Sequence, residues 1–264
     1  MGIVIGVVNQ KGGVGKTTTA TNITAGLGAL GKKVLLIDFD PQGNSTSGFG
    51  IKKKMLENTT YDVIIGNCRP SEAIIPTRYK NISIMPANAK LSEAEPLLMN
   101  MEQKSMQLRK AILQIRDDYD IIIIDSLPSL GILAVNTLAA CDTIIVPMVC
   151  EQFAVEGLAQ LMVTIKNVKK FNRDLSIMGV VYTMVDKRLL SVGEIKEIIG
   201  KAFDNKAIFK TEIPRNVRIS EAQAHGEPIM YFDKRSKGAE AFTQLSKEVL
   251  VKCREMEKAN AKKK

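Results

Sequence analysis

The sequence has few of the side chains that build metal clusters or disulfide frameworks. It contains one histidine, His225, and four cysteines, at positions 68, 141, 150 and 253. No two cysteines form a C-x-x-C pair, so the spacing favours neither a zinc site nor disulfides, and the reduced thiols of a cytoplasmic protein are the expectation. His225 has no second histidine or cysteine nearby, so we expect a loop or core residue rather than a ligand or a base.

Long apolar runs are also absent. No stretch reaches the roughly 18 apolar residues that would suggest a membrane span. Residues 1–8 are apolar but lack the charged region and cleavage site of a signal peptide, so we expect a core strand there. No linker, internal repeat or low-complexity segment divides the 264 residues, of which 45% are hydrophobic and 25% charged. This composition predicts one domain, at 1–256, and a flexible basic tail at 257–264.

The positive charge lies mainly toward the C-terminal end. Residues 201–264 hold 15 Lys and Arg against 9 Asp and Glu, within a chain of net charge +9. This excess fits a polyanionic partner, although a merely soluble basic protein would look similar.

Short apolar runs alternate with longer helical patterns. Runs such as 121–124 and 143–146 are continuously apolar, which indicates burial on both faces of a parallel sheet. The pattern predicts strands at 3–8, 33–38, 82–86, 120–125, 143–149, 178–184 and 208–213. It predicts helices at 16–30, 102–117, 131–139, 154–171, 191–203 and 237–258. This alternation predicts an α/β fold, a doubly wound and mostly parallel sheet with helices on both faces.

The last predicted helix carries one apolar stripe, because its large apolar residues recur at spacings of three and four. The stripe consists of Phe242, Leu245, Val249, Leu250 and Met256. Packing on the sheet is the preferred interpretation. A membrane-targeting helix is the alternative, disfavoured because only small and basic residues follow the stripe.

A glycine-rich loop, Lys11 to Thr18, lies between the first predicted strand and the first predicted helix. This context suits a phosphate-binding loop, because backbone N–H groups and the helix N-terminus attract phosphate oxygens. Lys16 can reach the outer phosphates, and the Thr17 hydroxyl can ligate Mg²⁺. The usual pattern has a glycine where this chain has Gln10, and Lys11 is an additional lysine in the loop.

Two further predicted strands end in carboxylates. Residues 34–37 lead to Asp38 and Asp40, and residues 121–124 lead to Asp125. A carboxylate at the end of an apolar strand is costly unless a cation or donor is near. Mg²⁺-bound water and the nucleophilic water are natural partners. The competing interpretation is that these acids only cap the turns that follow.

Taken together, these segments resemble the ParA/Soj family of partition ATPases, which carry a deviant Walker A loop and belong to the MinD/ParA superfamily. The resemblance extends to about Leu250 and rests on the segments 9–19, 38–44, 150–158, 213–222 and 236–240. One departure is Asp125-Ser126-Leu127-Pro128, where the family often has Asp-x-Pro-Pro. We expect this departure to alter switch mobility and to leave activity intact.

The resemblance implies a P-loop NTPase fold with ATP and Mg²⁺ as cofactors. It implies nucleotide binding by Lys11, Gly12, Gly13, Val14, Gly15, Lys16, Thr17, Thr18, Pro214 and Asn216. It implies metal binding by Thr17 and, through water, by Asp38 and Asp125. It also implies catalytic roles for Lys16, for Asp40, which would orient the attacking water, and for Lys11, which would contact the ATP of a second protomer.

The implied function is slow, Mg²⁺-dependent ATP hydrolysis coupled to chromosome or plasmid partition. An ATP-bound homodimer would bind DNA non-specifically, and a ParB-like partner would stimulate hydrolysis and release it. The protein would be cytoplasmic and nucleoid-associated, without a membrane partner. The DNA-binding candidates, each of which alone reads as a solvated charge, are Arg188, Arg215, Arg218, Lys234, Arg235 and Lys237. Only ten residues precede the loop, so we expect no N-terminal helix-turn-helix.

Three alternatives share the glycine loop. A membrane-cycling MinD-type ATPase would need an amphipathic tail. A nitrogenase-type iron protein would need paired cysteines for a shared cluster, and here Ser126, not cysteine, follows Asp125. A nucleotide-gated binding protein with negligible turnover is separated from a slow ATPase only by a measured rate.

Overall fold

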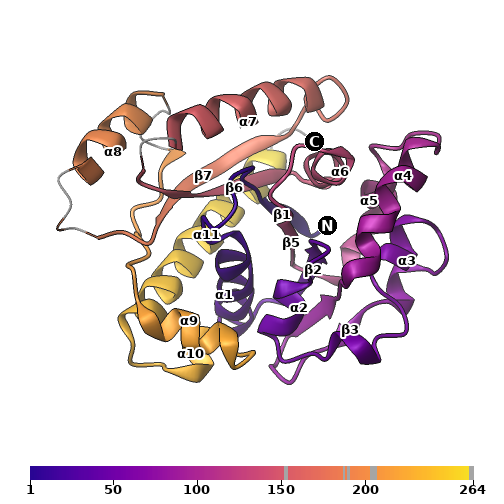
Figure 1. Cartoon of the computed structure of the whole chain (residues 1–264), viewed down its shortest axis with the longest axis horizontal. Coiled ribbons are helices and arrows are strands. Elements are labelled where there is room, and N and C mark those ends of the chain that lie inside the picture. The colour runs from indigo at the N-terminus through magenta and orange to yellow at the C-terminus, as the bar shows by residue number, and fades with distance from the viewer. Residues whose placement is uncertain (152–153, 187, 189–190, 203–206, 262–264) are drawn as a thin grey trace.

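The computed structural model describes residues 1–151, 154–186, 188, 191–202 and 207–261. Within them, one sheet has the strand order β3-β4-β2-β5-β1-β6-β7 (Figure 1). The strands are β1 Ile3–Val7, β2 Val34–Phe39, β3 Ile75–Pro76, β4 Ile82–Met85, β5 Ile121–Ser126, β6 Thr143–Val149 and β7 Ser176–Thr183. The β3–β4 pair is antiparallel and the other pairs are parallel. The predicted doubly wound, mostly parallel sheet is confirmed.

Helices cover both faces of the sheet. They are α1 Lys16–Ala29, α2 Asn44–Gly48, α3 Thr60–Ile64, α4 Ala94–Met99, α5 Gln107–Leu113, α6 Ile132–Ala140, α7 Ala154–Val168, α8 Ser191–Ala202, α9 Val217–Ala224, α10 Ile229–Phe232 and α11 Lys237–Ala261. Helices α3 to α8 pack into one apolar core. Helices α1, α9, α10 and α11 pack into a second core on the opposite face.

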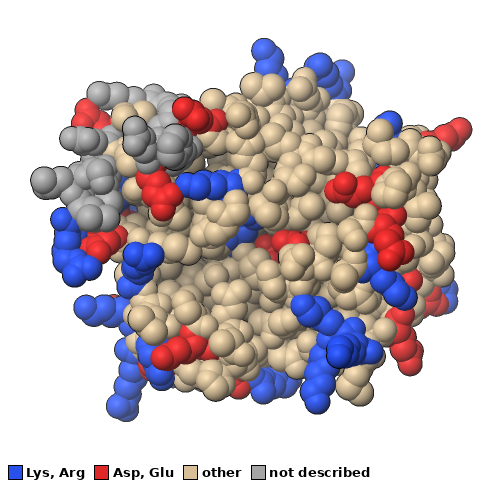
Figure 2. Space-filling view, viewed as in Figure 1, with Lys and Arg blue, Asp and Glu red and all other residues tan. Residues whose placement is uncertain are grey.

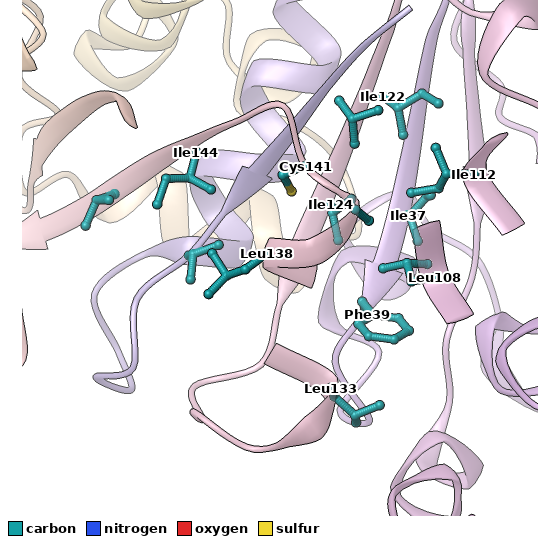
Figure 3. Packing of buried hydrophobic residues seen from close by; sticks show 14 of the residues in the cluster. Ile37, Phe39, Leu108, Ile112, Ile122, Ile124, Leu133, Leu138, Cys141 and Ile144 are labelled. Carbon is teal, nitrogen blue, oxygen red and sulfur yellow. The ribbon is translucent and has the colours of Figure 1, made fainter. Parts of the chain in front are cut away.

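Alternation along the central strands divides their side chains between these two cores. In β1, Val4 belongs to the core of α3 to α8, whereas Ile3 and Ile5 belong to the core of α1 and α11. In β5, Ile122 and Ile124 face the first core, which Figure 3 shows from close by. The continuous apolar runs therefore fill both faces, as the sequence predicted.

The apolar stripe of α11 packs inward. Phe242, Leu245, Val249 and Leu250 are buried in the core that includes α1, and Met256 packs against it. The preferred interpretation of the stripe is confirmed. The helix continues through residues 257–261, where the sequence predicted a flexible tail, and residues 262–264 lie outside the described part of the chain. Among the described residues, no helix is both long and apolar enough to span a bilayer.

The predicted strand at 208–213 is wrong. The segment touches β7 through an isolated bridge at Ile208 and a few backbone hydrogen bonds. The Glu248 carboxylate accepts the backbone N–H groups of Lys210 and Thr211, each at 2.9 Å. These donors are therefore not available to extend the sheet.

The predicted helix at 102–117 is much shorter in the structure, where α5 begins at Gln107. Gln103 has a φ of 51°, which a right-handed helix does not accept. The Asn136 side chain holds the resulting turn, because it donates to the Lys104 carbonyl and accepts from the Leu108 N–H. The last residue of the helix predicted at 191–203 lies outside the described residues.

The contact between α1 and α11 gives a stability prediction. A Cβ on Gly26 would lie 2.0 Å from the Ser246 Oγ and 2.6 Å from its Cβ. Gly26→Ala should therefore lower the free energy of unfolding by about 1–3 kcal/mol, measured by urea denaturation, although alanine favours helices. Combining it with Ser246→Gly should restore part of this loss. Equal stability of Gly26→Ala and the wild type would contradict the packing.

Candidate nucleotide site and basic surface

The parallel register brings three strand ends together. Asp125 pairs with Val7 of β1 on one side and with Asp38 of β2 on the other. The glycine-rich loop leaves β1 directly after Val7 and leads into α1 at Lys16. Two carboxylates and the loop lysine thus lie at the carboxyl edge of adjacent strands, where ligands bind in sheets of this type.

The loop has the backbone freedom that phosphate binding requires. Gly13 and Gly15 have φ values of 73° and 83°, in the left-handed region that favours glycine. A Cβ on Gly12 or Gly13 would meet no atom within 4 Å, so both border open space. Gly15 is the N-cap of α1 and no side chain caps the helix, so the first N–H groups of α1 can bind an anion.

The two loop lysines differ in environment. Lys16 is buried, and its Nζ donates to the Lys11 carbonyl at 2.9 Å. Burial lowers the pKa of Lys16, and the charges of Asp125 and Asp40 oppose that shift. The Lys11 Nζ instead pairs with Glu151 Oε2 at 2.5 Å, and 37% of the Lys11 side chain and 57% of the Glu151 side chain are exposed. Exposed pairs of this kind are weak, so Lys11 can exchange partners.

Gln10 accounts for the missing glycine of the usual pattern. Its Nε2 donates to the Gly157 carbonyl in α7 at 3.0 Å. Asn9, which precedes Gln10, is also held in place by its side chain. Its Nδ2 donates to the Pro147 carbonyl at 2.8 Å, and its Oδ1 accepts from the Lys11 N–H at 3.0 Å. Side chains therefore hold the front of the loop against β6 and α7, where a glycine could make no such contact.

Asp38 and Asp125 are both fully buried but have different partners. Asp38 Oδ2 accepts from the Thr46 N–H and the Thr46 hydroxyl, each at 2.7 Å. Asp125 Oδ2 accepts from the Ser45 hydroxyl at 2.7 Å, and Asp125 Oδ1 has no hydrogen-bond partner. An unpartnered buried carboxylate oxygen beside a phosphate loop fits a water bound to Mg²⁺.

Burial raises the pKa of both carboxyl groups. It raises the pKa of Asp125 to about 8, assisted by the charge of Asp38, and the nearby hydroxyls of Ser45 and Thr17 oppose the shift. It raises the pKa of Asp38 to about 6 against the hydrogen bonds from Thr46. Without a bound cation, the pair therefore retains a proton more readily than exposed carboxylates do.

Asp40 follows β2 and is also buried. Its Oδ1 accepts from the Gln42 N–H at 2.9 Å, and its backbone carbonyl accepts from the Gly43 N–H at 2.8 Å. These bonds shape the turn that leads into α2. Asp40 thus does cap a turn, as the competing interpretation held, and it also lies near enough to Lys16 to affect the pKa of that lysine.

A cavity of about 230 Å³ adjoins the loop at Gly15 and Thr18. Pro214 and Asn216 both line it. The Asn216 Oδ1 caps α9 by accepting from the Arg218 N–H at 2.8 Å. The Asn216 Nδ2 has no partner within the described part of the chain and can donate to a ligand.

Several residues of this site were not predicted. Thr183, Met184 and Gln223 line the same cavity, and Ser45 and Thr46 hold the buried carboxylates. Ser45 and Thr46 directly follow the segment 38–44, which could have drawn attention to them. Gln223 likewise directly follows the segment 213–222, whereas Thr183 and Met184 have no local pattern to mark them.

Five of the six basic candidates lie on or beside α9, α10 and the start of α11, and Arg188 lies between β7 and α8. Figure 2 shows Lys and Arg side chains projecting around the lower left of the view, where Figure 1 places α9 and α10. Arg218 pairs with Glu221 at 2.5 Å and with Asp233 at 2.9 Å, and Arg188 pairs with Asp186 at 2.5 Å. Of the six candidates, Arg215, Lys234, Arg235 and Lys237 are exposed and have no ion-pair partner among the residues that the structure describes.

A mostly parallel sheet with a glycine loop between its central strand and an uncapped helix makes the chain a P-loop nucleoside triphosphatase. A family model described as an AAA domain matches residues 2–177. Over 250 residues the chain is 46% identical to the sporulation initiation inhibitor protein Soj of Bacillus subtilis (strain 168), covering 94% of this chain and 98% of the relative. The chain belongs to the Soj/ParA family of chromosome-partitioning ATPases.

The chain is also similar to a second relative and to a solved structure. The chain is 42% identical over 253 residues to the chromosome-partitioning ATPase Soj of Treponema pallidum (strain Nichols), covering 96% of this chain and 98% of the relative. The structure of cobyrinic acid a,c-diamide synthase from Mycobacterium smegmatis with bound ADP and magnesium has a TM-score of 0.83 and 33% identity, covering 95% and 94% of the two chains.

The raised pKa of Asp125 gives a pH-dependent prediction for the nucleotide-free protein. Between 3.8 and about 8 the folded chain binds this proton more strongly than the unfolded chain, so its stabilising contribution is lost as the pH rises. Relative to wild type, Asp125→Asn should gain unfolding free energy steadily across that range, measured by urea denaturation. Asp117→Asn, at an exposed carboxylate, is the control. A stability difference that does not change with pH would contradict the burial argument.

Proposed function

We propose that the chain hydrolyses ATP slowly with Mg²⁺ and forms an ATP-sandwich homodimer that binds DNA non-specifically. A ParB-like partner stimulates hydrolysis and releases the dimer, so that the cycle segregates a chromosome or plasmid. The observation that carries this proposal is the uncapped glycine loop beside the unpartnered Asp125 Oδ1. The ADP and magnesium in the M. smegmatis structure support it.

The loop residues bind the phosphates. The N–H groups of residues 12–18 surround the phosphate oxygens, and the Lys16 Nζ moves from the Lys11 carbonyl to the β/γ-phosphates. Thr17 would ligate Mg²⁺, and Asp125 would accept a hydrogen bond from a water on the ion. Held there, Mg²⁺ would supply positive charge beside the transferred phosphoryl group. Asp38 would contact the same ion through a water while it accepts the hydrogen bonds from Thr46.

The base occupies the cavity beside Gly15. Pro214 fixes the backbone at its rim because its ring restricts φ. The Asn216 amide donates to the base, since its Oδ1 is already engaged by α9. Thr183 supports the loop from below, because its hydroxyl donates to the Val14 carbonyl at 2.9 Å.

Lys11 contacts the nucleotide of the second protomer. Its pair with Glu151 is solvent-exposed, so exchange of Glu151 for a phosphate loses little. In that position the ammonium group neutralises charge on the transferred phosphoryl group, as an arginine finger does. The homodimer is therefore the ATP-bound form of the protein.

DNA binds the basic surface around α9 and the start of α11. Lys and Arg contacts to phosphates are independent of sequence and sensitive to salt, and a dimer doubles the surface. This role places the protein in the cytoplasm on the nucleoid. The membrane-cycling alternative loses its main argument, because the apolar stripe of α11 is buried in the core.

Asp40→Ala should trap the ATP-bound dimer, because the variant binds ATP but cannot orient the attacking water. Light scattering should detect a lasting dimer with ATP, and phosphate release should fall at least about tenfold. Asp117→Ala, at an exposed carboxylate far along the chain, serves as the control. Turnover at the wild-type rate would remove Asp40 from catalysis.

DNA binding tests the proposal as a whole. Affinity for duplex DNA should be high with ATP and low with ADP or no nucleotide, and it should fall steeply between two salt concentrations. Lys16→Ala should abolish ATP binding and with it the ATP response.

Arg218→Glu should weaken DNA binding and leave the dimer intact. Arg69→Glu is the matched control, because Arg69 is exposed and pairs with Glu72 at i+3, as Arg218 does with Glu221. Equal DNA affinity in all nucleotide states would refute the proposal.

A further inference from the structure

Tyr79 and Tyr231 form an aromatic stack that the nucleotide site does not use. Tyr79 lies in the turn between β3 and β4, and Tyr231 lies on α10. Their ring centroids are 4.1 Å apart and their planes meet at 19°. The Arg78 guanidinium lies 5.1 Å from the Tyr79 centroid, and Phe49 meets Tyr79 edge-on at 5.9 Å. Tyr79 is thus enclosed, whereas Tyr231 lies at the end of the stack.

Tyr231 is partly open to solvent. The residue is 41% exposed, although Tyr79 covers one face of its ring. Any exposed ring area therefore lies on the opposite face or the ring edge. An open aromatic face at the end of a stack can accept another planar group with offset-stacking geometry.

The charges around this ring favour an anion. Two nearby carboxylates already have ion-pair partners, because Glu227 pairs with Arg78 and Asp233 pairs with Arg218, which also pairs with Glu221. Lys80, Lys234 and Arg235 are exposed and have no ion-pair partner among the residues that the structure describes. A planar anion would meet uncompensated positive charge on this surface. Lys80 adjoins Tyr79 in the turn, and Lys234 and Arg235 follow Tyr231 within four residues.

We propose that Tyr231 is a stacking subsite for an unpaired base of a single-stranded nucleic acid, with Lys80, Lys234 and Arg235 contacting the adjoining phosphates. An aromatic ring within a basic surface is the arrangement that binds single strands without sequence preference. Bases inside a duplex already stack on their neighbours and cannot offer a face. The subsite deepens the proposed DNA binding and rests on it for its role. It requires neither ATP nor a dimer, because every residue involved belongs to one protomer.

The test uses tyrosine emission of the full chain without nucleotide. The chain has five tyrosines and no tryptophan, so the emission reports tyrosine directly. Short oligothymidylate should bind at low salt and quench the emission. Oligouridylate should do the same, because stacking does not depend on the sugar, and preference for one of them identifies the source of the strand. A long duplex at the same nucleotide concentration should leave the emission unchanged; equal quenching by duplex and single strand would overturn the proposal.

Variants separate stacking from structural support. Tyr231→Leu should weaken oligothymidylate binding roughly 5- to 100-fold and remove the quenching, measured by anisotropy and emission. Tyr231→Phe should keep both, because stacking needs the ring and not the hydroxyl. Tyr61→Leu, on α3, controls for the loss of one tyrosine. Binding of wild-type strength by Tyr231→Leu, or equal weakening by the Leu and Phe variants, would show that the stack only braces α10.

A second variant keeps the test open if Tyr231→Leu does not fold. Lys80 is exposed, and Lys80→Gln should lower the slope of log affinity against log salt by about 0.7 for a single strand. An unchanged slope would remove Lys80 from the subsite and contradict the proposal. If the wild-type chain binds oligothymidylate but shows no ATP-dependent binding of duplex DNA, the proposed function is refuted and the subsite is not. The opposite result would refute the subsite alone.

Discussion

The parallel pairing of β2 with β5 places two carboxylates side by side in the interior, and the nucleotide site depends on this arrangement. Two buried like charges are unfavourable, and each needs a donor or a cation. Thr46 provides two donors to Asp38, whereas Ser45 provides one to Asp125 and leaves the second oxygen without a partner. Lys16 is the nearby cation, and the charges of Asp125 and Asp40 raise its pKa against the effect of burial. Negative charge at the strand ends is therefore only partly compensated, and it lies where the glycine loop can place a cation bound to phosphate.

The same constraint explains why α2 lies where it does. The Thr46 hydroxyl donates to Asp38 and accepts from the Ala87 N–H at 2.9 Å, so it joins the ends of β2 and β4. Ser45, one residue earlier, meets Asp125 on the next strand. A change in the charge of the carboxylate pair therefore acts on both hydroxyls of this short helix. Asp38 is in this respect a positioning residue for α2, in addition to any contact with a metal-bound water.

The sequence identified the parts of the molecule whose signal is local. The loop at 11–18 and the acids at the ends of β2 and β5 follow from short patterns with one geometric meaning each. Helices such as α2 and α10 were missed because four or five residues cannot display a helical period. The run at 208–213 was apolar enough to predict a strand. However, the Glu248 carboxylate, 37 residues further along, accepts a hydrogen bond from the Thr211 N–H. Tertiary partners of this kind are invisible until the chain is folded.

Helix α9 lies between the cavity beside Gly15 and the basic surface, and the residues at its start contribute to both. The side chain of Asn216 lines the cavity and caps the helix through the N–H of Arg218. The Arg218 side chain then reaches Asp233 beyond α10. One turn later, Gln223 accepts from the Thr18 hydroxyl at 3.3 Å, which ties α9 to the first turn of α1. A ligand that draws on Asn216 or Thr18 therefore acts directly on the helix that carries Arg218. Since a ligand shifts an equilibrium only through contacts that differ between states, these two are the contacts through which nucleotide occupancy can reach the basic surface.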